Sequence, residues 1–480
     1  MIEATVQLLV VLGALYLGSR YGSLALGAIS GIGLAILVLG FGMAPGTAPT
    51  DVIYIIIAAV TCAGALQASG GMDWLIQLAE KALRRHPGHI TFLAPFATFF
   101  LTVLVGTGHV VYTLMPIIAD IALKRGIRPE RPCAVASIAS QVGITCSPIA
   151  AAVVAVVSIS NLNGFDIAIP HVLAVTIPAS LCGLAIAAAV SYRRGPELAD
   201  DPEYQRRLAD PELRRKMMEA SATTLDRKIS NTSRRAVYIF LAAIAIIVIL
   251  AAVPSLLPSF DKLRAVTGAA SVATDGISIT PEQLATAGIS VPGVTEHYQS
   301  RLSMGVVIQI IMMSAAAFIF IFCKSKPKDA VGGAVWQNGM TAVVAIYGIA
   351  WLADTYFGHW LPSIKDSLGA MLATYSWLLA VVFFVVSILL NSQGAVVVSM
   401  VPAAFAMGVP GWVILGVFPS VYGYFFFPTY PSDIATVNFD RSGTTRIGKF
   451  LVNHSFMLPG LVCVAVATAV SYLIASLIWG

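Results

Sequence analysis

Long apolar runs separated by short polar stretches dominate the chain, and their lengths predict membrane-spanning helices. A helix needs about 20 mostly apolar residues to cross a hydrocarbon core about 30 Å thick. Polar residues concentrate between positions 193 and 235, which predicts a charged linker between two apolar halves, 2–192 and 236–478. The apolar runs lie near residues 4–18, 22–42, 51–69, 89–123, 133–158 and 169–192, and near 236–257, 304–322, 336–357, 367–408, 411–434 and 452–477. This pattern predicts an all-α polytopic membrane protein.

Composition supports this class and excludes others. Hydrophobic residues make up 58% of the 480 residues and charged residues 11%, whereas soluble domains carry about 25% charged residues. The net charge of +5 predicts no nucleic-acid partner, because basic residues beside membrane helices set their orientation. The six cysteines include no C-x-x-C pair, so no disulfide framework or zinc site is expected. The start MIEATVQ has no basic residue, which predicts a first membrane helix rather than a cleaved signal peptide.

The two halves match each other in register, which indicates an internal duplication. One shift of 286 residues carries Trp74-Leu75 onto Trp360-Leu361, Gly108 onto Gly394, and Pro116 onto Pro402. The same shift superposes the run 169–192 on the run 452–477. A constant offset of this kind is typical of transporter folds built from repeats.

The distribution of Lys and Arg predicts the topology. If the runs 89–123 and 367–408 are re-entrant hairpins, the other runs cross the membrane about ten times. All Lys and Arg then fall on one face except Lys262, Arg264, Arg301 and Lys365. The positive-inside rule places that face and the linker in the cytoplasm, and both termini on the opposite, extracytoplasmic side. The halves would then form an inverted repeat. A pair of short spanning helices in place of each hairpin stays open as an alternative and leaves the loop sides unchanged.

Four polar breaks interrupt the apolar runs. The hairpins carry the tips GTGH at Gly106–His109 and NSQG at Asn391–Gly394. Two interrupted runs carry GITCSP at Gly143–Pro148 and PTYPSD at Pro428–Asp433. Because two prolines lie three residues apart in the second, residues 427–433 are expected to be unwound. Irregular backbone at membrane depth must line a cavity, so the breaks predict a binding site.

The tips and breaks offer mainly neutral hydrogen-bond donors, which suits an anion. Half-helix N-termini add free N–H groups and partial positive charge without the cost of burying a full charge. The residues expected to bind substrate are Thr107, Gly108, His109, Thr145, Ser147, Asn391, Ser392, Gln393, Thr429, Tyr430 and Ser432. Asp354 and Asp433 are candidates for binding a coupling proton or cation. No cofactor is expected, and the sequence names no metal site.

Several of these residues also have a plain structural interpretation. His109 could face the substrate or be a hydrogen-bonded hairpin histidine. Asp354 could be a solvated aspartate near the membrane interface, and Asp433 could cap the helix that resumes after Pro431. The segment Gly443–Thr445 could bind an anion, but N-capping of the final helix would explain it equally well.

Several motifs resemble one bacterial transporter family. They read GTGHVVYTLMPII, IRPERP, YGIAW, NSQ, PTYPSDIATVNFDRSGTTRIGKF, NHSF and LPG. Together they resemble the anaerobic four-carbon dicarboxylate transporters, the DcuA and DcuB branch of the Dcu family. The likeness covers about residues 5–192 and 236–478, and the segment 429–459 is its most specific part.

The resemblance implies a secondary transporter of the bacterial inner membrane. It implies exchange of fumarate, malate or aspartate for succinate, in support of fumarate respiration. The outer loop at about residues 264–299 lies within the predicted loop 258–303 and is rich in Thr, Ser, Ala and Gly. It has no counterpart in the pattern of the family. It is interpreted as either a disordered segment or a small lid.

Other functions fit less well or stay open. An enzyme would need clustered nucleophiles, metal ligands or paired acids, and the histidines show no H-E-x-x-H or H-x-x-x-H spacing. A channel, an inorganic-ion carrier and a cation-coupled dicarboxylate symporter share the predicted architecture and remain alternatives. A homo-oligomer and a sensor-kinase partner are compatible with transport, and nothing in the sequence tests either.

Overall fold

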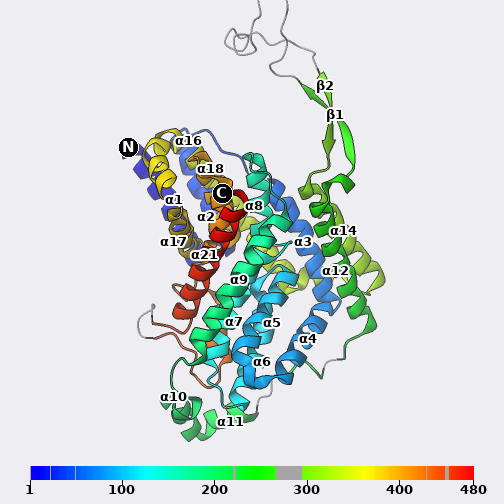
Figure 1. Cartoon of the computed structure of the whole chain (residues 1–480), viewed down its shortest axis with the longest axis vertical. Coiled ribbons are helices and arrows are strands. Elements are labelled where there is room, and N and C mark those ends of the chain that lie inside the picture. The colour runs from blue at the N-terminus through cyan, green and yellow to red at the C-terminus, as the bar shows by residue number, and fades with distance from the viewer. Residues whose placement is uncertain are drawn as a thin grey trace, which may run out of the picture.

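The computed structural model describes residues 2–21, 23–48, 50–219, 223–226, 228–265, 295–428, 430–448 and 453–480. These residues are almost entirely helical, with one two-stranded sheet (Figure 1). The first half contains α1 (Ile2–Tyr21), α2 (Ser23–Ala35), η1 (Ile36–Gly40), α3 (Thr50–Ala68), α4 (Gly71–Arg85), η2 (Pro87–His89), α5 (Ile90–Val105), η3 (Gly108–Val110), α6 (Val111–Lys124), α7 (Glu130–Val142), η4 (Gly143–Cys146), α8 (Ala151–Leu162) and α9 (Ile169–Tyr192).

The linker and the second half complete the chain. The linker forms η5 (Leu198–Asp200), α10 (Pro202–Ala209) and α11 (Pro211–Glu219). The second half contains α12 (Asn231–Ala252), η6 (Pro254–Leu256), β1 (Ser259–Ala265), β2 (Thr295–Arg301), α14 (Met304–Phe322), α15 (Pro327–Gly332), α16 (Ala334–Thr374), α17 (Leu378–Leu390), α18 (Gln393–Ala406), α19 (Gly411–Val417), η7 (Phe418–Val421), α20 (Pro431–Phe439) and α21 (Met457–Trp479).

Several helices are long and apolar enough to span a membrane. Among the described residues there are seven, or up to eight if the bent pair of α3 and α4 forms one span. Shorter apolar helices accompany them, including α1, α17 and α18. The expected all-α, multi-pass class is therefore confirmed, while the number of crossings stays a prediction.

The two ends of the molecule carry different elements. Both chain termini and the strands β1 and β2 lie in the upper half of Figure 1, and α10 and α11 lie at the lower end. We call the end with α10 and α11 the linker face and the opposite end the terminal face.

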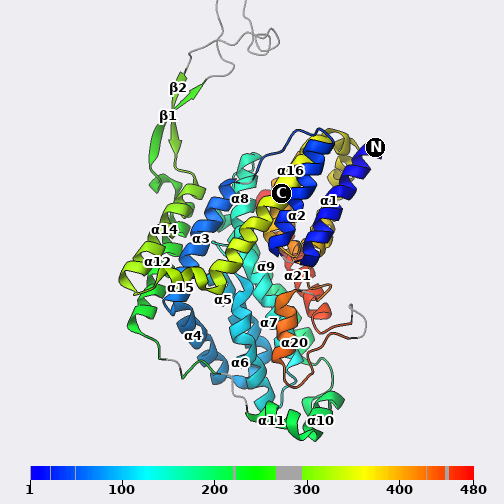
Figure 2. The ribbon, with the colours of Figure 1, turned by 180° about the vertical axis from the view of Figure 1, so that it is seen from behind.

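Helices that the 286-residue shift relates pack against each other, namely α9 with α21 and α3 with α16. The halves also differ, because a 73° bend separates α3 from α4, whereas α16 continues as one helix of 41 residues (Figure 2). The inverted repeat therefore stays a prediction.

The helix α7 lies at the centre of the fold. Every residue from Glu130 to Val142 is buried, and α7 packs against α5, α6, α9, α20 and α21. A helix buried on all sides must find partners for its polar side chains inside the protein. Those partners come from the breaks and from the linker.

Both predicted hairpins have their turns at the predicted tips. The arms α5 and α6 join at residues 106–110, and α17 and α18 join at Asn391 and Ser392. With 16 and 13 residues, α5 and α17 are about 24 and 20 Å long, shorter than a hydrocarbon core of about 30 Å. The first hairpin lies toward the linker face and the second toward the terminal face (Figure 1).

The second hairpin begins later than the apolar run 367–408 predicts. The helix α16 continues to Thr374 and α17 starts at Leu378. The backbone of α16 stays helical through Pro362, because a single proline kinks a packed helix without necessarily ending it.

The second interrupted run also differs from the expectation. The prolines predict an unwound segment 427–433, but the helical turns end at Val421 and α20 begins at Pro431. Ser432 and Asp433 are therefore helical, and the described part of the unwound segment lies between Tyr422 and Tyr430. Proline suits the first helical position, where its fixed φ fits and its missing N–H needs no partner. The first break, Gly143–Pro148, ends α7 as predicted.

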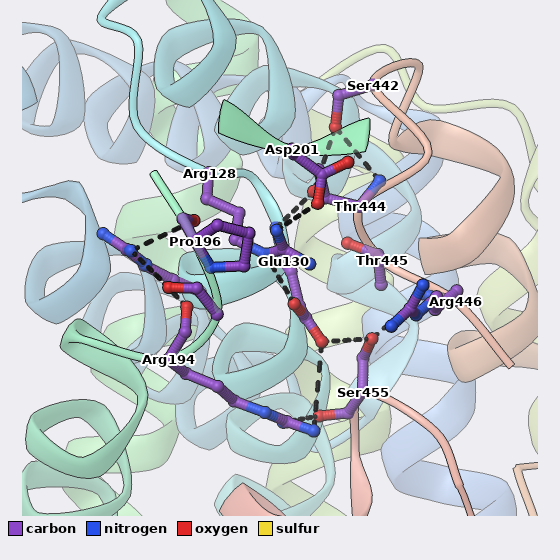
Figure 3. A network of polar contacts seen from close by, with 12 residues as sticks. Arg128, Glu130, Arg194, Pro196, Asp201, Ser442, Thr444, Thr445, Arg446 and Ser455 are labelled. Atoms are coloured by element: carbon purple, nitrogen blue, oxygen red, sulfur yellow. Dashed lines mark hydrogen bonds and ion pairs between the residues drawn. The ribbon is translucent and has the colours of Figure 1, made fainter. Parts of the chain in front are cut away.

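The linker is folded against the start of α7 (Figure 3). One oxygen of Asp201 caps α10 by accepting hydrogen bonds of 3.0 Å from the N–H groups of Glu203 and Tyr204. The other oxygen pairs with Arg128, which also pairs with Glu130 at 2.7 Å. A polar linker at the end of a membrane protein is thus held by buried charges.

Two further expectations need comment. Gly443–Thr445 does not cap the final helix, because α21 begins at Met457 and these residues instead surround Asp440. In the predicted outer loop, β1 and β2 pair antiparallel with Ser259 opposite Arg301. Residues 266–294 lie outside the described residues, so neither interpretation of that loop is tested.

Candidate functional site

The polar breaks meet at the C-terminal half of α7. Ser137 and Gln141 lie four residues apart on this helix, so their side chains share one face. Asp433 contacts Ser137, while Tyr424 and Gln393 contact Gln141. The tip of the first hairpin also packs against the Gln141 side chain. Elements from both halves therefore converge on two residues of α7.

Tyr424 and Gln393 hold Gln141 in place. The Tyr424 hydroxyl donates to Oε1 of Gln141 at 2.7 Å. The Gln393 amide donates to the Gln141 carbonyl oxygen at 2.8 Å and to the Tyr424 hydroxyl at 3.3 Å. These bonds join the second hairpin tip, the second break and α7 into one network.

Asp433 is the acidic member of the cluster. Its side chain is 1% exposed, and its Oδ1 accepts a hydrogen bond of 2.7 Å from the Ser137 hydroxyl. The structure does not support the capping interpretation, because α20 has no side-chain cap hydrogen bond. Among the ion pairs of the described residues, none includes Asp433. A buried carboxylate without a cationic partner is costly.

The first hairpin tip approaches α7 through glycine. A Cβ at Gly108 would lie 2.8 Å from the Ser140 carbonyl oxygen and 2.4 Å from Nε2 of Gln141, so glycine allows this close approach to the backbone of α7. The Thr107 hydroxyl caps η3 by accepting from the N–H of His109 at 3.4 Å. The His109 ring stacks on Tyr112 with centroids 5.7 Å apart. The tip of the first hairpin thus contacts Gln141, as Gln393 at the tip of the second hairpin also does.

Three buried polar groups beside this network have no hydrogen-bond partner among the described residues. They are Oε1 of Gln393 and the hydroxyls of Tyr422 and Ser432. Tyr422 packs edge-on against Tyr424 with centroids 4.8 Å apart. An unsatisfied buried group costs about 1–3 kcal/mol, and native structures carry few of them without a functional reason.

Three other predicted residues use their hydroxyl groups locally, and a fourth, Asn391, occupies a special backbone conformation. The Thr145 hydroxyl donates to a carbonyl of its own turn at 2.9 Å, and the Ser147 hydroxyl accepts a nearby N–H at 3.5 Å. Ser392 caps α18 at 3.3 Å. Asn391 ends α17 in the left-handed conformation with φ of 50°, which asparagine tolerates better than most residues.

The remaining predicted residues are divided. Tyr430 stacks on Tyr424 with centroids 4.5 Å apart and belongs to the cluster. Thr429 lies outside the described residues. Asp354, on α16, accepts the N–H of Thr47 at 2.6 Å and so anchors the loop before α3. The structure therefore brings Gly108, Gln393, Tyr430, Ser432 and Asp433 together around α7 and places Asp354 elsewhere.

Sequence reasoning missed Ser137, Gln141, Tyr422 and Tyr424. Ser137 and Gln141 are polar residues at helical spacing in the apolar run 133–158, directly before the break at Gly143. That spacing predicts one polar helix face next to the break and could have identified both residues. Tyr422 and Tyr424 stand in the aromatic segment VYGYFFF, where nothing distinguishes them from core residues.

The cluster gathers hydrogen-bonding groups of the kind that bind small polar ligands. It offers phenol, hydroxyl and amide groups with one carboxyl group, and Gln141, Gln393, Ser432 and Asp433 are at most 2% exposed. In the part of the chain that the structure describes, no three His, Cys, Asp or Glu side chains gather to hold a metal. A ligand here would be enclosed.

Known proteins resemble this chain along almost its whole length. The family model described as anaerobic C4-dicarboxylate membrane transporter matches residues 3–479. The anaerobic C4-dicarboxylate transporter DcuB of Escherichia coli O6:H1 is 42% identical over 98% of both chains. The C4-dicarboxylate transporter DcuA of Wolinella succinogenes is 34% identical over 98% of this chain and 99% of its own.

The fold has a counterpart among solved structures. The crystal structure of the Alcanivorax borkumensis YdaH transporter, described as having an unusual topology, aligns with a TM-score of 0.51 and 15% identity. The alignment covers 88% of this chain and 85% of that one. This likeness supports the fold alone. The family match confirms the resemblance drawn from the motifs and the expectation that the protein is not an enzyme. The chain belongs to the anaerobic C4-dicarboxylate membrane transporter family.

Proposed function

We propose that this protein exchanges four-carbon dicarboxylates, such as fumarate, malate, aspartate and succinate, across the bacterial inner membrane by alternating access. The observation that carries the proposal is the enclosed cluster on α7 with its three unpartnered groups. The hydroxyls of Tyr422 and Ser432 would donate to substrate carboxylates. Oε1 of Gln393 would accept a hydrogen bond from the hydroxyl of malate or the ammonium group of aspartate.

The arrangement of the hairpins supports alternating access. The first hairpin lies toward the linker face and the second toward the terminal face, and their tips touch the same residue, Gln141. Withdrawal of one tip would open the cluster to one side, while the other tip would keep it closed. The donors of the cluster are neutral, so a substrate dianion can bind there without a bound cation. One dicarboxylate can then drive the transport of another, which is exchange.

Cation-coupled symport is a second candidate, which Asp433 favours. Its buried carboxyl group has only a hydroxyl partner, so a proton or sodium ion bound there would offset substrate charge. We propose exchange as the main mode because the cluster holds three neutral unpartnered groups for the substrate and only one acid, Asp433, for a coupling cation.

We further propose that the linker face lies in the cytoplasm and both termini in the periplasm. The linker carries many of the 29 Lys and Arg residues, and cytoplasmic loops are enriched in these residues. The placement of both termini opposite α10 and α11 supports this topology.

Counterflow in liposomes tests the proposed function. Liposomes that contain the purified protein and unlabelled succinate should take up labelled fumarate or aspartate, and empty liposomes should not. Repeating the assay with and without sodium and with a proton gradient separates exchange from symport. Equal uptake by loaded and empty liposomes would contradict exchange.

A further inference from the structure

A second set of polar groups lies one helical turn from Asp433, at the linker face. The helix α20 carries Asp433 in its first turn, and Val437 follows four residues later on the same face, about 6 Å along the axis. Val437 lines a cavity of about 340 Å³ together with Glu203, Arg207, Gly443, Thr445, Arg446 and Ile447. That volume is at the lower end of the range for small-ligand sites.

Thr445 is one of the lining residues of this cavity and has a hydroxyl with no hydrogen-bond partner among the described residues. Its side chain is 1% exposed. Its backbone is fixed independently, because the N–H of Thr445 donates to Asp440 at 2.6 Å. Asp440 also accepts from the N–H of Ser442 and the hydroxyl of Thr444, each at 2.9 Å. The loop therefore holds an unpartnered donor in a defined place.

Two guanidinium groups lie at the same cavity. Arg207 donates to Glu203 at 2.7 Å and to the Arg441 carbonyl oxygen at 3.0 Å. It lies directly over Gly443, where a Cβ would come within 2.4 Å of the guanidinium carbon. Gly443 has φ of 75°, a backbone conformation that favours glycine.

Arg446 carries the second guanidinium group at the cavity. Its backbone N–H bonds to the Ser455 hydroxyl at 3.0 Å, but its guanidinium pairs with no acid in the described ranges. Figure 3 shows Arg446 and Thr445 beside each other next to the Arg128–Glu130 network. The one acid at the cavity, Glu203, is already paired with both Arg206 and Arg207, so the cavity retains positive charge.

We infer that this cavity is a vestibule site that binds one carboxylate group of a dicarboxylate at the linker face. Arg446 and Arg207 would supply charge-assisted hydrogen bonds and Thr445 a neutral donor. The inference rests on the proposed function, because it makes the cavity the last stop before the buried cluster. Its position one turn below Asp433 on α20 places it beside the route that opening of the first hairpin would create.

Half-saturation concentrations measured separately at each membrane face test the inference. Inverted and right-side-out vesicles present the linker face and the terminal face, respectively, to labelled succinate. Arg446→Gln and Thr445→Val should each raise the half-saturation concentration at the linker face about tenfold, the loss expected for one hydrogen bond to a charged group. The value at the terminal face should not change. Arg206→Gln is the matched control, since Arg206 pairs with the same Glu203 but does not line the cavity.

Stability separates binding from a structural role. Removal of an unpartnered buried hydroxyl should leave the thermal midpoint of Thr445→Val unchanged or higher. A lower midpoint with equal changes at both faces would overturn the inference, and so would no change at either face. If inorganic phosphate at the linker face competes as well as succinate in the wild type, and Arg446→Gln removes that competition, the carboxylate assignment is wrong. Absence of any exchange by the wild type would contradict the proposed function instead.

Discussion

The Tyr424 hydroxyl donates a 2.7 Å hydrogen bond to Oε1 of Gln141, although the two residues lie 283 positions apart in the chain. Tyr424 stands in the unwound segment before α20, and Gln141 stands at the end of α7. The bond therefore joins the second half of the chain to the first at the point where both hairpin tips arrive. Any opening of the cluster must preserve this bond or replace it.

Tyr424→Phe should lower the stability of the protein. The substitution leaves Oε1 of Gln141 buried without its donor, which costs about 1–3 kcal/mol. The double variant Tyr424→Phe with Gln141→Leu should lose less than the sum of the single variants, because it leaves no orphaned acceptor. Thermal unfolding of the purified proteins in detergent measures these differences. Additive losses would show that the two side chains do not interact.

Ser432→Ala and Thr145→Val should differ in their effect on substrate affinity. The Ser432 hydroxyl is unpartnered, so its loss should remove a substrate hydrogen bond and weaken affinity about tenfold. The Thr145 hydroxyl is already bonded within its own turn, so its loss should change affinity less than twofold. Counterflow at a series of labelled fumarate concentrations gives both values. Equal effects would contradict the assignment of Ser432.

The sequence was sufficient for features that depend on local chemistry. The apolar runs predicted the helices because membrane helices must be apolar along their length. The tips at Gly106–His109 and Asn391–Gly394 were predicted because glycine and polar residues interrupt those runs. The role of the charged segment 193–235 as a linker stays a prediction, and α12 begins inside this segment at Asn231.

Features that depend on tertiary contacts were beyond the sequence. Pro431 starts α20 instead of interrupting a helix, and only the surrounding packing decides between these roles of proline. The partners of Gln141 come from segments more than 250 residues away. In the sequence, Asp354 and Asp433 are equally good candidates for binding a coupling cation. In the structure, the carboxylate of Asp354 accepts a hydrogen bond from the N–H of Thr47.

The docking of the linker should depend on pH through Glu203. Hydrogen bonds from Arg206 and Arg207 lower the pKa of Glu203 from 4.5 to about 2. Burial raises the pKa of Asp201, but hydrogen bonds from the Tyr204 N–H and from Arg128 together lower it by more, so its net shift is also downward. A carboxyl group with a lowered pKa stabilises the fold when the pH is above the ordinary pKa of that group. This stabilisation is lost as the pH falls toward the pKa of the group in the folded state.

Glu203→Gln tests this dependence. At pH 7 the wild type should melt about one or two degrees above the variant, since partly exposed pairs contribute little. The difference should shrink below about pH 4.5 and vanish near pH 2, as the pKa of Glu203 requires. Glu197→Gln is the control, because its carboxylate is 67% exposed. A difference that stays constant across this range would contradict the pKa shift.

Reporter fusions test the topology. An alkaline-phosphatase fusion after Gly480 should be active, because the enzyme requires the periplasm, and a fusion within residues 199–227 should be inactive. The reverse result would place the linker face outside the cell. It would also contradict the use of the positive-inside rule for this chain.

Asp433→Asn tests the mode of transport. Asparagine keeps an oxygen that can accept from Ser137 but cannot carry the negative charge or bind a coupling cation as the carboxyl group does. We expect wild-type exchange to proceed at the same rate with and without sodium or a proton gradient, and the variant to retain this exchange. Affinity in the variant should stay equal or rise several-fold, because removal of a carboxylate near a dianion removes repulsion.

Asp354→Asn is the matched control for that experiment, since its carboxylate anchors a loop through Thr47 and is not part of the cluster. It should leave both exchange and its cation dependence unchanged. If the wild type instead accumulates dicarboxylate against a gradient when sodium or protons drive it, and Asp433→Asn alone abolishes that accumulation with exchange intact, then Asp433 binds the coupling cation. In that case symport is the native mode and cation-independent exchange is wrong, because the cost of burying the Asp433 carboxylate would be offset by the ion it carries.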